Sequence, residues 1–239
     1  MPPQSIHQAD TERPDLGSEP ESPARAWLHA RARLMPQLLT KAPPWVRGVF
    51  DHAWAPMTAL TQQVDCLPPV LLDYLVDSAA IQTGSAGYVA ICNGESRYAP
   101  GPTCLQAGRQ QVDPTLVGVA FVSVEDLATD SARPLHVIGH LIDHHLGCAG
   151  APDAAWLSEG GGVTSGWREA GARMPRLFAL GYGADEVAQA NIHDYFAQSL
   201  ALYCRDRQRL NVADPQICKW FRSTLWSEAF WRGQRPLTG

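Results

Sequence analysis

The stretch Leu135–Gly147 reads LHVIGHLIDHHLG and carries four of the protein's eight histidines. Its apolar residues recur at helical spacing, which predicts a short helix. At about 100° per residue, His136, His140 and Asp143 fall within roughly 60° of one another on one face of that helix. Two imidazoles spaced i, i+4 can therefore hold one metal ion.

This spacing is the ligand half of the His-Glu-x-x-His motif of zinc peptidases, in which the glutamate is the general base toward the attacking water. Here Val137 stands at the glutamate position. Ile138 and Ile142 make the other side of the helix apolar, which predicts that the helix is buried. Two interpretations stay open: a zinc site without its usual base, or a buried helix whose histidines only bond the backbone or Asp143.

Composition narrows the class of protein. A chain of 239 residues, 45% hydrophobic and 18% charged, can bury a core as one large domain or as a domain with a helical annex. A net charge of −5 and the absence of a basic block argue against nucleic acid as a partner. No run of 18 apolar residues predicts a membrane span.

Targeting and redox signals are weak. The first residues, Met1–Ser5, lack the basic and apolar regions of a secretory signal, so the default expectation is a cytoplasmic protein, with secretion by a route without a signal peptide left open. The cysteines contain no Cys-x-x-Cys pair and are expected to be mainly reduced core residues, although a Cys92–Cys104 or Cys204–Cys218 bridge stays possible. The six are Cys66, Cys92, Cys104, Cys148, Cys204 and Cys218.

The N-terminal third is predicted to be helical after a tail. Residues 1–23 are rich in Pro, Glu, Asp, Ser and Gln, which predicts a disordered tail. Apolar residues at helical spacing predict helices over 24–39, 45–63 and 70–79, and Pro56 is a candidate break in the second of them. We therefore divide the chain into the tail, a helical N-terminal extension over 24–66, and a main domain.

The composition changes after residue 80. Residues 88–92 and 117–124 are β-branched runs bounded by turn residues, which predicts two strands of a small sheet. Tyr98–Pro102 is expected to be a loop. Helices are predicted again over 191–204 and 214–230. The expected fold class is α+β, mostly helical, with a small sheet preceding the metal-binding helix.

Two further motifs are rejected. Gly160–Gly162 lacks the Gly-Lys-Ser/Thr of a phosphate-binding loop and is expected to be a flexible loop beside a cleft. Ser158 lacks the Gly-x-Ser-x-Gly setting of a serine hydrolase.

Besides His136 and His140, a zinc site needs a third protein ligand from elsewhere in the chain. The candidates are Asp194, His193, Glu159, His144 and His145.

At these residues the chain resembles the catalytic domain of anthrax lethal factor and its relatives, which are gluzincin-type zinc metallopeptidases. The first matching block is His136-x-x-Gly-His140-x-x-Asp143, where the family reads His-Glu-x-Gly-His-x-x-Asp. The second is Asp194-Tyr-Phe-Ala-Gln198, where the family reads Glu-Phe/Tyr-Phe-Ala-Glu. The match in order and spacing runs over roughly 67–226, with specific motifs only in these two blocks.

The resemblance implies a zincin-like, metallopeptidase-related domain over 67–232 that acts on a protein or peptide. Carried over residue by residue, it implies that His136, His140 and Asp194 bind Zn²⁺. It also implies that Asp143 orients a ligand histidine and that Gln198 stands at the place of a supporting glutamate. The family's oxyanion-stabilising tyrosine has no clear counterpart over residues 184–191, although a displaced Tyr182 could take that role.

Three departures from the family coincide at Val137, Asp194 and Gln198. Loss of a positioned general base costs on the order of 10² to 10⁴ in rate. We therefore expect one bound zinc ion with degenerate or lost peptide-bond hydrolysis, unless Glu159 or Asp143 acts as a rescue base. The alternatives are a pseudopeptidase that binds an extended peptide along the strand at 118–124, and a polar cluster that has lost the metal.

Overall fold

The computed structural model describes residues 22–77, 86–103, 106–107, 111–112, 116–151 and 153–234. The tail predicted over residues 1–23 lies outside these ranges except for its last two residues, and Cys104 lies outside them as well.

The centre of the fold is a four-stranded sheet with the order β1-β2-β6-β3. The strands β1 (Ala32–Leu34), β2 (Ala86–Cys92) and β6 (Val117–Ser123) are parallel, and β3 (Arg97–Ala99) pairs with β6 in the antiparallel sense. Both faces of β2 and β6 are apolar, as expected for strands buried on two sides. A separate antiparallel pair is formed by β4 (Gln106–Ala107) and β5 (Gln111–Val112).

Helices make up most of the rest of the described chain. In order they are α1 (Pro23–Arg31), α2 (Leu38–Lys41), α3 (Pro44–Val49), α4 (Ala55–Val64), α5 (Pro69–Asp77), α7 (Val124–Ala128), α8 (Arg133–Cys148), α9 (Ser165–Gly171), α10 (Met174–Ala179), α11 (Glu186–Ala190), α12 (Ile192–Arg205), α13 (Arg207–Ala213), α14 (Pro215–Ser223) and α15 (Glu228–Arg232). The expectation of a mostly helical mixed fold with a small sheet is confirmed.

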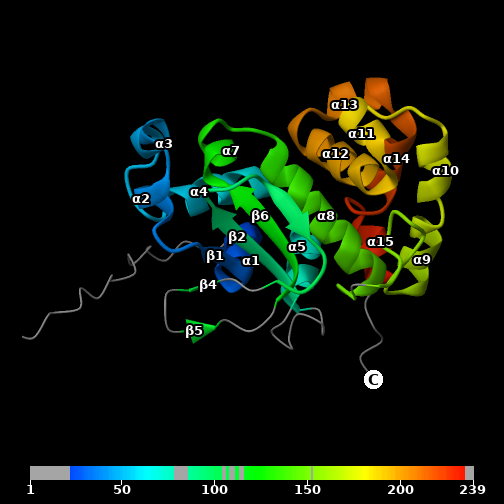
Figure 1. Ribbon diagram of the computed structural model, residues 1–239. Helices are drawn as coiled ribbons and strands as arrows, with labels where there is room; N and C mark the ends of the chain where they lie inside the picture. Colours follow the sequence, from blue (N-terminus) through cyan, green and yellow to red (C-terminus); the bar gives the residue numbers. More distant parts are fainter. Residues whose placement is uncertain are drawn as a thin grey trace, which may run out of the picture.

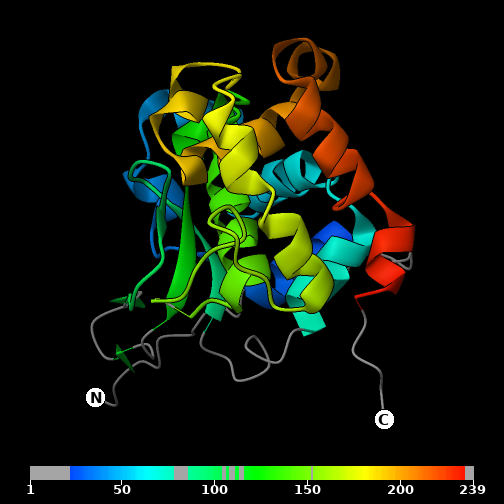
Figure 2. The ribbon, with the colours of Figure 1, turned by 90° about the vertical axis from the view of Figure 1, so that its right-hand side faces the viewer.

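The histidine helix α8 is the central element of the packing. It contacts β6 and β3 on one side and α12 on the other, so that it lies between the sheet and the C-terminal helices (Figure 1). The C-terminal helices α14 and α15 then run along the molecule toward α5 (Figure 2), where the rings of Tyr74 and Trp231 are 5.8 Å apart. One hydrophobic core contains side chains from Trp27 of α1 to Phe221 of α14. It includes residues on both sides of position 66, where the predicted N-terminal extension ends.

Four predicted elements differ from the structure. The helix expected over 24–39 ends at Arg31, because residues 32–34 pair with β2 as a parallel strand. The helix expected over 45–63 is divided into α3 and α4, and that over 214–230 into α14 and α15. The predicted loop at Tyr98 begins inside β3, which pairs with β6. In each case strand pairing or an interruption of the helix overrides the local sequence pattern.

No helix in the described ranges combines the length and the apolar character needed to cross a membrane.

Candidate metal centre

Helix α8 presents two histidines beside its buried face. Leu135, Ile138 and Ile142 are fully buried in the core. The side chains of His136 and His140 lie one turn apart and keep 17% and 13% of their surface exposed. The helix thus anchors both imidazoles rigidly while leaving their ring edges accessible.

Helix α12 supplies a carboxylate from its first turn. Asn191 caps this helix, and its Oδ1 accepts a hydrogen bond of 2.9 Å from the backbone N–H of Asp194. The Asn191 side-chain amide also donates to Asp194 Oδ2 at 2.6 Å. The second oxygen, Oδ1, is therefore directed toward α8.

Three potential ligand atoms meet between these helices. Asp194 Oδ1 lies 3.2 Å from Nε2 of His136 and 3.2 Å from Nε2 of His140. The two Nε2 atoms are 3.1 Å apart. In the described chain, His136, His140 and Asp194 are the group whose ligand atoms lie close enough together to hold one metal ion. We call these three residues the triad.

A glycine allows the two helices to approach closely. A Cβ atom added to Gly139 would lie 2.8 Å from the Cα of Ala197 on α12, closer than real Cβ contacts. Small residues at both positions therefore bring the backbones together. This approach lets the short side chain of an aspartate on α12 reach the two histidines of α8.

Gln198 fixes the orientation of one histidine. Its Oε1 lies 3.1 Å from Nδ1 of His136, and its amide group donates to Asp185 Oδ2 at 2.7 Å. Because an amide oxygen only accepts, Nδ1 carries the proton in this contact, and Nε2 is left with its lone pair toward the triad. Gln198 thus does what the partner of a metal-binding histidine usually does.

The pKa shifts of Asp194 and His136 favour the forms in which these groups bind a metal. Hydrogen bonding from His140 is the largest cause that lowers the pKa of Asp194. Burial, followed by the neighbouring His140, lowers the pKa of His136. A carboxylate beside neutral imidazole is the state in which these groups bind a metal.

Asp143 and Glu159 belong to a second group of polar residues. The fully buried Asp143 accepts hydrogen bonds from the backbone N–H of Ser158 at 2.7 Å and from its Oγ at 2.6 Å. Its Oδ2 lies 3.5 Å from Nδ1 of His193, whose Nε2 lies 3.5 Å from Glu159. We call Asp143, Ser158, Glu159 and His193 the Asp143 cluster. Asp143 therefore orients the loop after α8, and in the described chain its carboxylate lies against Ser158 and His193; that it orients a zinc-binding histidine stays a prediction.

The other candidate residues predicted from the sequence, Tyr182, His144 and His145, lie outside the triad. Tyr182 is 51% exposed on a turn. The side chain of His144 bonds the hydroxyl of Tyr98 at 2.7 Å and lies 3.0 Å from the carbonyl of Ala151. His145 is buried and, within the described chain, its ring nitrogens have no hydrogen-bond partner. Neither histidine belongs to the triad.

Sequence reasoning missed two aromatic rings and a cap. Tyr98 of β3 stacks on His140 with ring centroids 6.0 Å apart, and Trp156 lies 6.2 Å from the same ring. They cover one side of the site, yet their positions depend on strand pairing and loop closure that no local pattern reveals. Asn191 had a readable signal, since an Asn three residues before an acidic residue is a common helix start.

The chain matches no protein-family model, no curated protein and no solved structure in comparisons with known proteins.

Proposed function

We propose that this protein binds one zinc ion through the triad and is a zincin-like, metallopeptidase-related protein whose peptide-bond hydrolysis is degenerate or lost. The observation that carries the proposal is the near-equilateral arrangement of the three ligand atoms, 3.1, 3.2 and 3.2 Å apart.

These separations suit zinc. With bond lengths of about 2.0–2.2 Å, the edges of a tetrahedral zinc site are about 3.4 Å long. The donor set of two imidazoles and one carboxylate is that of several catalytic zinc sites, which keep a fourth position for water. Without a cation, these close contacts are relieved only by protons on the imidazoles, such as the one that His140 donates to Asp194.

The chain's own residues argue against efficient hydrolysis. When bound, zinc would lower the pKa of a water and polarise a carbonyl group. Val137, at the place of the base, is a buried hydrocarbon side chain that takes no proton. Glu159 accepts a hydrogen bond from the backbone N–H of Trp156 at 2.9 Å and pairs with His193, so both of its oxygens are engaged. Rescue by Glu159 would require it to leave these partners.

Chelation tests the metal. We expect EDTA to lower the melting temperature of protein purified without added zinc by about 5–10 °C, because an ion that binds only the folded state stabilises it. The double variant His136→Ala, His140→Ala should not respond to EDTA, whereas the control His52→Ala, an exposed histidine far from α8 in the sequence, should respond like the parent. An equal response of parent and double variant would contradict the proposal.

Restoring the base tests the descent from a peptidase. We expect Val137→Glu, loaded with zinc, to gain hydrolysis of an unstructured protein by a factor on the order of 10² or more over the parent. The same substitution combined with Asp194→Ala should abolish the gain. A folded, zinc-loaded Val137→Glu variant without activity would mean that more than the base has been lost.

Peptide binding without cleavage is the second candidate. The predicted docking strand is β6, which is paired on both sides by β2 and β3, so a peptide cannot add to it. The edge strand beside it is β3, and its Tyr98 stacks on His140 of the triad. A peptide added along β3 would therefore pass the triad. Saturable binding of an unstructured peptide to EDTA-treated protein, weakened by Tyr98→Ala, would favour this candidate.

A further inference from the structure

The far end of α12 carries a pair of thiols. Cys204 lies in the last turn of α12, and Cys66 lies in the turn between α4 and α5. Both are half-buried, and the described cysteines are all free thiols. The sequence pattern offered Cys218 as a partner for Cys204, whereas in the structure the side chain beside Cys204 is that of Cys66.

The two side chains interact directly. Both line the same cavity, and the Cys66 thiol donates to the carbonyl oxygen of Gln63 at 3.2 Å. The neighbouring Cys204 side chain is the largest cause that lowers the pKa of Cys66, burial acts against it, and the guanidinium of Arg205 lowers this pKa as well. The Cys66 side chain, together with burial, raises the pKa of the Cys204 thiol. Arg205 is itself held by Asp130 through contacts of 2.7 and 2.8 Å. The pair thus combines a thiol whose pKa is lowered with one whose pKa is raised, beside a guanidinium that Asp130 holds in place.

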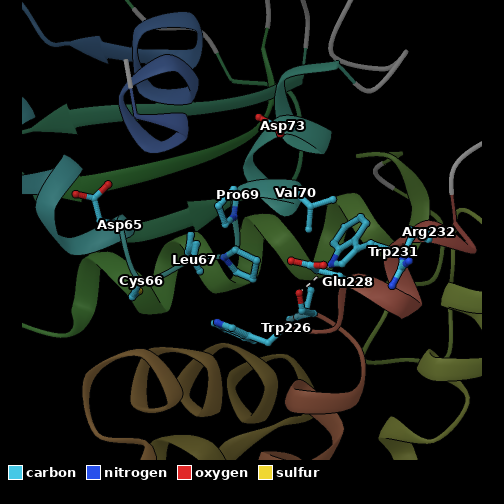
Figure 3. A pocket seen from close by; sticks show the side chains of 12 residues that line it. Asp65, Cys66, Leu67, Pro69, Val70, Asp73, Trp226, Glu228, Trp231 and Arg232 are labelled. Carbon is cyan, nitrogen blue, oxygen red and sulfur yellow. Dashed lines mark hydrogen bonds between the residues drawn. The ribbon is translucent and has the colours of Figure 1, made fainter. Parts of the chain in front are cut away.

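Small molecules can reach the pair. Cys66 and Cys204 both line a cavity of about 390 Å³, together with Arg205 and Asp130. Cys66 also lies on the wall of a second cavity of about 630 Å³, between Asp65 and Leu67 and across from Trp226 (Figure 3). A small disulfide therefore has access to Cys66 from two sides.

We propose that Cys66 and Cys204 are a modification site: they form a reversible intramolecular disulfide that ties the turn before α5 to the end of α12, with a low-molecular-weight disulfide such as oxidised glutathione as the oxidant.

The exchange balances in two steps. The Cys66 thiolate attacks one sulfur of the oxidant, forms a mixed disulfide and releases one glutathione thiolate, which takes up a proton. Removal of the negative charge at Cys66 frees Cys204 to lose its own proton. The Cys204 thiolate then attacks the Cys66 sulfur, forms the protein disulfide and releases the second glutathione. The protein loses two electrons and two protons, and the oxidant becomes two thiols.

Peptide mapping after oxidation tests the proposal. The full-length protein is incubated with oxidised glutathione, free thiols are blocked, and the digest is analysed with and without a reductant. We expect a linked pair of peptides containing Cys66 and Cys204, a mass loss of two hydrogens, and a melting temperature higher by about 5–10 °C that dithiothreitol reverses.

Matched variants make the outcome decisive. Cys66→Ser and Cys204→Ser should each abolish the linked peptide and the rise in melting temperature, whereas Cys92→Ser and Cys148→Ser, which remove other half-buried thiols, should keep both. Independent glutathione adducts on Cys66 and Cys204, or a bridge from Cys204 to Cys218, would overturn the proposal. None of these readouts requires a metal, so the test is independent of the proposed function.

Discussion

Helix α8 takes part in two polar clusters that differ in how they are satisfied. In the Asp143 cluster, donors and acceptors match: the buried carboxylate accepts two short hydrogen bonds from Ser158, and His193 lies beside it. In the triad, Nε2 of His136 and Nε2 of His140 face each other and share a single oxygen of Asp194. The first cluster is complete within the protein, whereas we propose that the second is completed by a cation. On this account, the difference separates a structural polar cluster from a candidate metal site on the same helix.

Disrupting the Asp143 cluster should lower the free energy of unfolding the most. In Asp143→Ala, the buried N–H and hydroxyl of Ser158 lose their acceptor, so we expect the free energy of unfolding to fall by about 3–5 kcal/mol. Urea denaturation measures this change. The exposed Asp153→Ala, in the loop that follows α8, should change stability by less than about 0.5 kcal/mol.

The zinc content of folded Asp143→Ala protein should stay at that of the parent, since Asp143 bonds none of the triad. Loss of zinc from a folded Asp143→Ala variant would remove the distinction between the two clusters.

His145 of α8 lies outside both clusters, and its pKa predicts how the stability of the protein depends on pH. Burial, then His144 and Arg31, lower the pKa of His145 to about 3. The unfolded chain takes up this proton near pH 6.5, whereas the folded chain does not, so stability falls as the pH drops from about 6.5 toward 3. From pH 7 to pH 4 we expect this residue alone to cost about 3 kcal/mol.

Urea denaturation across this pH range should show a shallower loss of stability for His145→Phe than for the parent. Identical pH profiles would mean that His145 is protonated in the folded protein, as a group with a polar partner would be.

Pushing α8 and α12 apart should disturb the geometry of the triad. The added methyl of Gly139→Ala meets the backbone of Ala197, so we expect a loss of about 1–3 kcal/mol in stability and weaker zinc binding. Gly48→Ala, where the new methyl meets open space, is the control and should leave zinc binding unchanged. Calorimetric zinc titration measures both variants, and parent-like affinity in Gly139→Ala would show that helix spacing does not set the ligand geometry.

The smallest expected effect comes from the partner of His136. Gln198→Ala leaves Nδ1 of His136 without its acceptor, and we expect zinc affinity to fall about 10- to 100-fold with little change in stability. Competition with a zinc chelator of known affinity measures the change. An unaltered affinity would mean that another group orients this imidazole.

The sequence predicted the site better than its surroundings. The i, i+4 spacing on α8 is a local pattern, so His136 and His140 could be named from it, whereas Asp194 was one of five candidates and was selected only through the family resemblance. The strand β1 was missed, because residues 32–34 continue a helical pattern and become a strand only through pairing with β2. The partners of Asp143 and the meeting of Cys66 with Cys204 were missed for the same reason, since they depend on contacts between distant segments.

Elemental analysis of protein purified without added zinc tests the central claim most directly. The account predicts about one zinc ion per chain in the parent and in His52→Ala, and none in the variant that combines His136→Ala with His140→Ala. No metal in the parent, even after zinc is offered and excess is removed, would contradict it and would make the triad a polar cluster satisfied by protons.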